Sequence, residues 1–144
     1  MMKRSVIGLL ASLFFTNIAQ AQEPSNLLTI VSSPEPQTQL MSMVLSMQSL
    51  QQGAKVDILL CGPAGDLALA APPASATEPQ QPKGMSPHGL MQLLMEKGAT
   101  VSVCALYLPN KPATTEALLQ GITVAKPDVM ATRILNPNTK VLSF

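Results

Sequence analysis

The sequence predicts an α/β fold, a three-layer α/β/α sandwich in which helices cover both faces of a mainly parallel sheet of about five strands. Short β-branched runs alternate with segments of helical apolar spacing along most of the chain. The run Leu27 to Val31 is continuously apolar or β-branched, which is typical of a strand buried on both faces. Glycines at positions 53 and 98 separate a helical segment from the next strand, as expected of helix C-termini.

The first half of the chain predicts a strand, helix and strand unit. Leu27 to Val31 is the expected first central strand, and Ser32-Ser33-Pro34 ends it. A helix is expected over Gln37 to Gln52, followed by a strand over Val56 to Cys61. The apolar residues of this helix recur at spacings of three and four: Leu40, Met43, Val44, Met47 and Leu50.

The middle of the chain predicts a loop, a helix and the strand that carries the second cysteine. Ala70 to Gly84 is rich in Ala, Pro and Gln without apolar periodicity, so we expect a long mobile loop beside the strand tips. Ser86 is the candidate cap of a helix that starts at Pro87 and ends before Gly98. The strand that follows runs from Thr100 to Cys104.

The last third of the chain predicts shorter elements. A helix is expected from Thr114 to Gln120, with Thr114 as its cap. A brief strand over Ile122 to Val124, a helix over Asp128 to Leu135 and a final strand over Val141 to Phe144 follow.

The N-terminus has the three parts of a secretory signal peptide. Lys3 and Arg4 form a basic start, the run Val6 to Phe15 is apolar, and Ala19-Gln20-Ala21 is a small-x-small cleavage site. We therefore expect residues 1–21 to be a signal peptide and residues 22–144 to form one domain. The apolar run is too short to span a bilayer, so a soluble periplasmic protein without membrane insertion is expected after cleavage.

Composition excludes several classes of function. Loss of Lys3 and Arg4 with the leader changes the formal net charge from +1 to −1, which leaves no basic excess to attract nucleic acid. Two separated cysteines and one histidine lack the spacing of a structural zinc site, so no metal site is expected. The turn Gly62 to Gly65 lacks a dinucleotide or Walker pattern, and no cofactor is expected.

Chemistry is predicted at the two cysteines. Cys104 closes a buried strand at its C-terminal end, where α/β folds place reactive groups, and a helix starting at Thr114 would lower the pKa of its thiol. Cys61 ends its own strand, where it either packs or pairs with Cys104 in a disulfide. His88, in the first turn of its helix, is either an ordinary surface residue or a base for Cys104.

Two segments resemble the DsrE/DsrF-like family, which includes persulfide carriers of sulfur relays. One is Leu94-Met95-Glu96-Lys97-Gly98-Ala99-Thr100-Val101-Ser102-Val103-Cys104, and the other is Glu116-Ala117-Leu118-Leu119-Gln120-Gly121-Ile122-Thr123-Val124 with the chain ending. The resemblance implies a DsrE-like domain that forms a homo-oligomer, a trimer or a hexamer. It also implies that Cys104 accepts sulfur as a persulfide and exchanges it with a donor or acceptor protein.

Two functions therefore follow from the sequence. The first is an exported thiol protein that carries sulfur on Cys104, with Cys61 and His88 as accessories. The second is a non-catalytic, homo-oligomeric binding or assembly module whose cysteines are structural.

Overall fold

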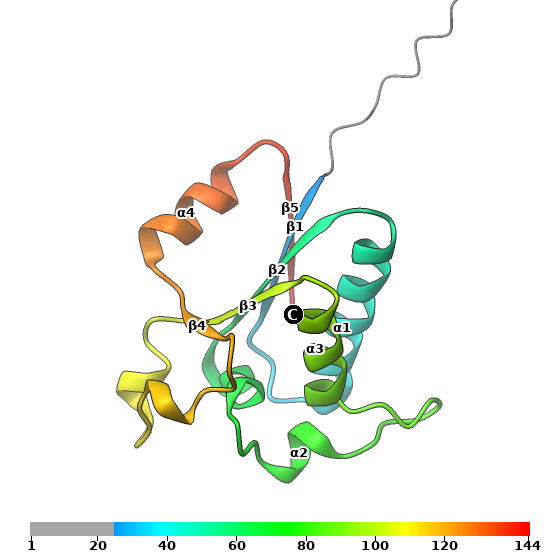
Figure 1. Cartoon of the computed structure of the whole chain (residues 1–144), viewed down its shortest axis with the longest axis vertical. Helices are drawn as coiled ribbons and strands as arrows, with labels where there is room; N and C mark the ends of the chain where they lie inside the picture. Colours follow the sequence, from blue (N-terminus) through cyan, green and yellow to red (C-terminus); the bar gives the residue numbers. More distant parts are fainter. Residues whose placement is uncertain (1–24) are drawn as a thin grey trace, which may run out of the picture.

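A computed structural model describes residues 25–144, so the expected signal peptide, residues 1–21, lies outside the described part. Five strands and four α-helices follow one another with three 3₁₀-helices, and Figure 1 labels the strands and α-helices. In chain order the elements are β1 (Asn26–Val31), α1 (Pro36–Gln51), β2 (Lys55–Leu60), η1 (Gly62–Ala68), α2 (Ala74–Thr77), α3 (Pro87–Glu96), β3 (Thr100–Val103), η2 (Leu108–Asn110), η3 (Thr115–Ala117), β4 (Thr123–Val124), α4 (Pro127–Leu135) and β5 (Thr139–Ser143).

The strands form one five-stranded sheet in the order β4-β3-β2-β1-β5, and all four pairings are parallel. Helices lie on both sides of the sheet, with α1 and α3 on one face and α4 on the other (Figure 1). The predicted α/β sandwich with a parallel sheet of five strands is confirmed. The sequence left the strand order open, and the structure makes β2 and β3 neighbours.

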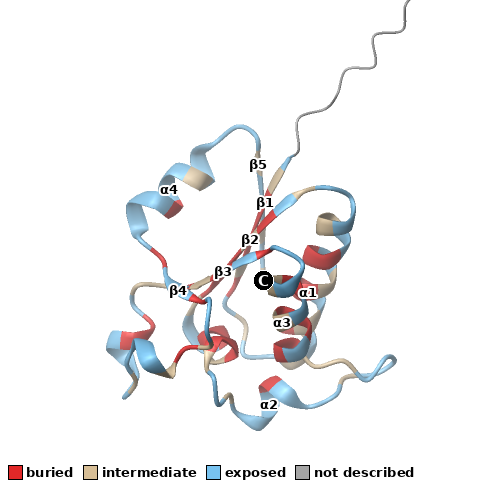
Figure 2. Cartoon of the chain, viewed as in Figure 1, coloured by how far each residue is buried: buried red, intermediate tan, exposed pale blue. Residues whose placement is uncertain are grey.

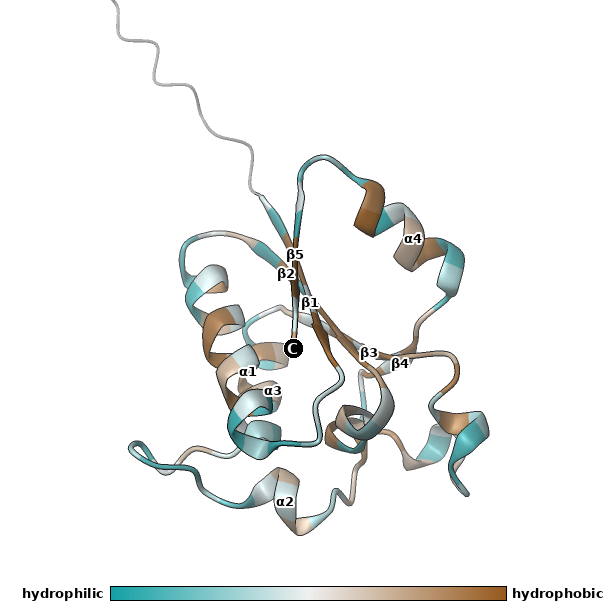
Figure 3. Cartoon of the chain, turned by 180° about the vertical axis from the view of Figure 1, so that it is seen from behind, coloured by the Kyte–Doolittle hydropathy of each residue, from teal (hydrophilic) through white to brown (hydrophobic). Residues whose placement is uncertain are grey.

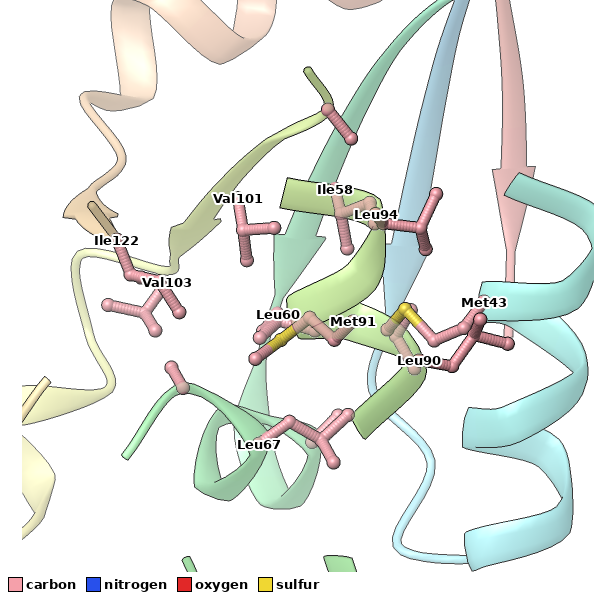
Figure 4. Packing of buried hydrophobic residues seen from close by; sticks show 14 of the residues in the cluster. Met43, Ile58, Leu60, Leu67, Leu90, Met91, Leu94, Val101, Val103 and Ile122 are labelled. Atoms are coloured by element: carbon pink, nitrogen blue, oxygen red, sulfur yellow. The ribbon is translucent and has the colours of Figure 1, made fainter. Parts of the chain in front are cut away.

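The main core lies between the sheet and the pair α1 and α3. Alternate residues of β2 (Val56, Ile58 and Leu60) belong to this core. Figure 4 shows Leu90, Met91 and Leu94 of α3 packed over these strands, with Met43 of α1 beside them. Ser86 caps α3 as predicted, because its hydroxyl accepts a hydrogen bond from the Gly89 N–H at 3.1 Å.

Among the helices of residues 25–144, α4 is the one that covers the opposite face of the sheet. Met130 is the single buried residue of this helix, and it joins a small apolar cluster with Leu28 and Leu59. Arg133 ties the helix to β2 through an ion pair with Asp57 at 2.6 Å. Figure 2 shows that most of α4 is exposed, so this layer of the sandwich is thin.

Two predicted segments differ from the structure. The expected loop over Ala70 to Gly84 contains the helix α2, whose Ala76 is buried in the main core. The expected helix from Thr114 to Gln120 is wrong: only the single 3₁₀ turn η3 forms there, and the side chain of Thr114 makes no cap hydrogen bond. Leu118 instead forms an antiparallel bridge with Leu69. Beside it, the Leu119 N–H donates to the Ala68 carbonyl at 2.8 Å.

No helix in residues 25–144 has both the length and the apolar composition needed to cross a bilayer.

Candidate functional site

The two cysteines meet at the C-terminal edge of the sheet, where β2 and β3 end side by side. The register pairs Leu60 with Val103, so Cys61 and Cys104 are the next residues on the two strands. The Cys104 N–H still donates to the Leu60 carbonyl at 2.8 Å, which continues the ladder up to the cysteine. Sheet register therefore places the backbones of the two cysteines side by side.

Cys61 and Cys104 form a disulfide, with their Cα atoms 5.1 Å apart. This separation lies within the range of roughly 4.4 to 6.8 Å that disulfides require. The sequence left packing and pairing open for Cys61, and the structure supports pairing. In the described part of the chain, neither cysteine is left free.

The disulfide belongs to the thin side of the sandwich. Both cysteines are half-buried and pack against the apolar cluster of the α4 face, which includes Met130 and Ala125. The backbone N–H of Ala125 donates to the Val103 carbonyl at 2.8 Å, so β4 runs beside the Cys104 strand up to this point. Apolar side chains pack against the cysteines on one side. At the strand ends, part of each cysteine is exposed to solvent.

Two chain segments leave the disulfide and touch each other. Gly62 follows Cys61 with a φ of +51°, a left-handed conformation that turns the chain from β2 into η1. Cys104 is followed by a turn in which the Tyr107 N–H donates to the Cys104 carbonyl at 2.9 Å. The Tyr107 ring then lies directly on Gly65, where an added Cβ would overlap the ring carbons.

A polar cluster holds these two segments together. The Tyr107 hydroxyl donates to the Asp66 carboxylate at 2.7 Å, and the Lys111 ammonium approaches the same oxygen at 2.8 Å. The Lys111 nitrogen also lies 5.7 Å from the centre of the Tyr107 ring. Burial and the adjacent Asp66 carboxylate raise the pKa of Tyr107, so its phenol stays protonated and donates.

His88 lies away from the cysteine cluster. Its helix, α3, packs in the main core on the α1 face, whereas the cysteines belong to the α4-face cluster. The imidazole is buried, and its Nδ1 lies 2.9 Å from the Leu67 carbonyl, a contact that accounts for the ring without a catalytic role. A base function for His88 toward Cys104 stays a prediction that no observed contact supports.

The sequence reasoning missed the cluster around Asp66. Tyr107 is the single tyrosine of a chain with 3% aromatic residues, and it lies three positions after Cys104. A rare aromatic residue so close to a candidate site is a signal that the sequence contains. Its partner Asp66 carried no such signal, because it is distant from Tyr107 in sequence.

A cavity of about 470 Å³ lies elsewhere, between α1 and the segment 80–85. Its walls are mostly apolar and include Met41, Met47 and Met85, but neither cysteine lines it. Among residues 25–144, no three His, Cys, Asp or Glu side chains come close enough together to hold a metal ion.

Solved structures show what this arrangement resembles. A crystal structure of the ychN protein from E. coli matches with a TM-score of 0.66 at 16% identity, covering 84% of this chain and 99% of that one. This chain has the ychN-like fold. A protein of unknown function, MTH1491 from Methanobacterium thermoautotrophicum, matches with a TM-score of 0.61 at 10% identity, covering 83% of this chain and 99% of that chain. No family model and no curated protein matches the sequence.

Both likenesses cover almost the whole of the matched proteins, so they extend beyond a single βαβ unit to the complete domain. At these identities they show the fold alone. They support the ychN-like and DsrE-like architecture that the resemblance of the Cys104 strand implied.

Proposed function

We propose that the protein is an exported thiol protein that carries sulfur as a persulfide on Cys104, with Cys61 as its partner thiol. The observation that carries the proposal is the Cys61–Cys104 disulfide at the edge of the parallel sheet. Its position at the C-terminal ends of two parallel strands is where α/β domains commonly build sites. The assignment of sulfur to Cys104 rather than Cys61 rests on the resemblance to the DsrE/DsrF-like family.

The proposed location is the periplasm. The signal-peptide features of residues 1–21 and the disulfide both fit an oxidising compartment. Because the oxidised form predominates there, sulfur uptake begins from the disulfide rather than from a free thiol.

The uptake step uses hydrosulfide. Its sulfur attacks the Sγ of Cys104, a new sulfur–sulfur bond forms, and the bond between the two cysteines breaks. Cys61 leaves as a thiolate and Cys104 keeps the added sulfur as a persulfide. The sulfide sulfur is oxidised and the disulfide is reduced, so this step needs no further oxidant.

The persulfide then has two fates. The Cys61 thiolate can attack the Sγ of Cys104, which reforms the disulfide and releases hydrosulfide. Alternatively, an acceptor thiolate attacks the outer sulfur and takes it, leaving Cys61 and Cys104 as a dithiol. A disulfide-bearing partner protein must then accept the electrons of the dithiol before the next cycle.

Two single variants test this proposal with intact-mass analysis. Oxidised protein is treated with sodium sulfide, exposed thiols are alkylated, and the added sulfur is located by peptide mapping. The wild-type protein is expected to gain one sulfur atom and two alkyl groups, one alkyl group on the outer sulfur of the Cys104 persulfide and one on Cys61. Sulfur found on Cys61 alone, or a disulfide that sulfide does not open, would contradict the proposal.

The variants Cys61→Ser and Cys104→Ser form a matched pair, since each removes one thiol and changes one atom. After loading with inorganic polysulfide, Cys61→Ser should retain a persulfide on Cys104, because the thiol that expels hydrosulfide is gone. Cys104→Ser also has no second thiol to expel hydrosulfide, but it lacks the proposed acceptor and should therefore retain no sulfur. Equal loading of both variants would refute a specific role for Cys104.

The second candidate function is a homo-oligomeric binding or assembly module with a structural disulfide. The observation that favours it is the set of exposed apolar side chains around the thin face: Val129, Ile134, Leu135 and Val141. Figure 3 shows a hydrophobic turn at the C-terminal end of α4. Such residues suit subunit contacts, and the family resemblance implies a trimer or hexamer.

Sulfur uptake by the oxidised protein distinguishes the two candidates, and sedimentation of the oxidised protein and of the double variant Cys61→Ser/Cys104→Ser tests the assembly. A module predicts the same oligomer for both proteins and no sulfur uptake by the wild type. A sulfur carrier predicts uptake whatever the oligomer.

A further inference from the structure

Two chain segments lead away from the disulfide, and side chains connect them a second time. The segment after Cys61 is η1, and the segment after Cys104 contains Tyr107 and Lys111. We call the contacts of Asp66 with Tyr107 and Lys111, together with the Tyr107 ring on Gly65, the tyrosine clamp. The clamp and the disulfide therefore join the same two segments of the chain.

The sheet alone does not hold these segments. The last ladder contact of the two strands is the hydrogen bond from the Cys104 N–H to the Leu60 carbonyl. Beyond it the chain leaves the sheet on both strands, as η1 and as the turn through Tyr107. The η1 segment is held in the main core, and the clamp joins it directly to the segment after Cys104.

The clamp combines a buried aromatic ring with a charged hydrogen bond. Tyr107 is 5% exposed, and its ring packs so closely on Gly65 that a side chain at that position would have no room. Its hydroxyl donates to a carboxylate, which makes a charge-assisted hydrogen bond, and Lys111 balances the charge of that carboxylate. No member of the clamp is a cysteine, so the contacts do not depend chemically on the disulfide.

We infer that Asp66 and Tyr107 are positioning residues that keep the two thiols within bonding reach when the disulfide opens. The inference rests on the proposed function in one respect, namely that the disulfide opens while the protein is folded. The clamp and the disulfide join the same two segments, so each stabilises the other: once one has formed, forming the second costs less conformational entropy.

This coupling has two consequences for the proposed chemistry. The clamp stabilises the disulfide relative to the dithiol, so removing it shifts the folded protein toward the dithiol. It also holds the Cys61 thiolate beside a persulfide on Cys104, which speeds the release of hydrosulfide. The clamp therefore limits the lifetime of the carried sulfur, unless an acceptor thiol takes it first.

The experiment compares Tyr107→Phe and Asp66→Asn with the wild-type protein in glutathione buffers of graded ratio. Tyr107→Phe keeps the ring on Gly65 and removes the hydrogen bond, and Asp66→Asn keeps an acceptor and removes the charge. Glu78→Gln is the matched control for the carboxylate, since Glu78 is exposed and lies outside the clamp. Alkylation and mass analysis give the dithiol fraction.

Both clamp variants should shift the dithiol–disulfide equilibrium toward the dithiol, by at most about fivefold, which corresponds to the whole strength of one partly exposed charged hydrogen bond. The control should match the wild type. A merely structural role predicts another pattern: oxidised and reduced protein lose thermal stability equally, and the equilibrium stays within about twofold of wild type. That pattern would overturn the inference.

A second readout separates this inference from the proposed function. In protein loaded with polysulfide, the clamp variants should release hydrosulfide more slowly than the wild type. If sulfide never adds to Cys104 but the glutathione equilibrium shifts, the clamp stands and sulfur carriage fails. If the wild-type disulfide resists reduction until the protein unfolds, both are refuted.

Discussion

Reduction of the Cys61–Cys104 disulfide should lower the free energy of unfolding by about 4 kcal/mol. The bond closes a loop between residues 43 positions apart in sequence, and its main effect is to restrict the unfolded chain. The folded state should change little, because sheet register already holds the two Cα atoms 5.1 Å apart. Total stabilities of single domains are about 5 to 15 kcal/mol, so reduction removes a large share.

Urea unfolding of the oxidised and the reduced wild-type protein measures this difference directly. Both forms keep the sulfur atoms that pack against the α4-face cluster, so the comparison isolates the cross-link from the loss of packing. The double variant Cys61→Ala/Cys104→Ala controls for effects of the reductant, which should not change its stability. A difference below about 1 kcal/mol would refute the reasoning, since the unfolded chain would then already be restricted without the bond.

Three further predictions concern the clamp and the helix before the cysteine strand. The phenol of Tyr107 should ionise in the native protein only well above its ordinary pKa of 10.0, and tyrosinate absorbance measures this for the single tyrosine. The protonated phenol therefore contributes fully to stability below pH 10, and this contribution is lost as the pH rises further. Gly65→Ala should destabilise the protein by about 1 to 3 kcal/mol, measured by urea unfolding, because the new Cβ overlaps the tyrosine ring; unchanged stability would contradict this packing. Ser86→Ala should lower the free energy of unfolding by about 1 kcal/mol through loss of the α3 cap, whereas Ser86→Asn, which supplies another cap, should restore most of it.

The central strands could be predicted from the sequence because they are short runs of mostly apolar or β-branched residues. Leu27 to Val31 and Val56 to Leu60 are buried on both faces, which leaves few alternatives to a central parallel strand. Strand order could not be predicted, because it depends on which edge each connection reaches. From β1 the chain adds β2, β3 and β4 in turn toward one edge of the sheet. It then returns and places β5 beside β1 at the other edge.

The helix α1 shows a limit of apolar periodicity. The predicted apolar positions include Met43 and Met47, which are buried, but Ser42 and Ser46 are fully buried beside them. The Ser46 hydroxyl lies 2.8 Å from the Thr29 hydroxyl of β1, so small polar residues face the sheet and satisfy one another. Hydroxyl pairs of this kind are invisible to a pattern that counts only apolar residues.

The candidate site was predictable in parts. Each cysteine could be assigned to a strand end, because the runs before Cys61 and Cys104 are apolar and β-branched. Their pairing depended on β2 and β3 being neighbours in register, which no local pattern encodes. The expected helix after Thr114 fails for a related reason: its residues pair with the end of η1 instead, a tertiary contact that overrides local preference.

Contacts other than the disulfide hold the geometry of the site, and this bears on how the protein would handle sulfur in the proposed function. Register fixes the cysteine backbones through the Cys104 to Leu60 hydrogen bond, and the clamp fixes the segments beyond them through Asp66 and Tyr107. Neither set of contacts uses a sulfur atom. In the proposed function, a persulfide on Cys104 therefore forms beside a thiolate that is already in position to expel it. Net sulfur transfer then requires that the acceptor thiol reach the outer sulfur faster than Cys61 reaches Sγ, which favours an acceptor that binds before hydrosulfide does.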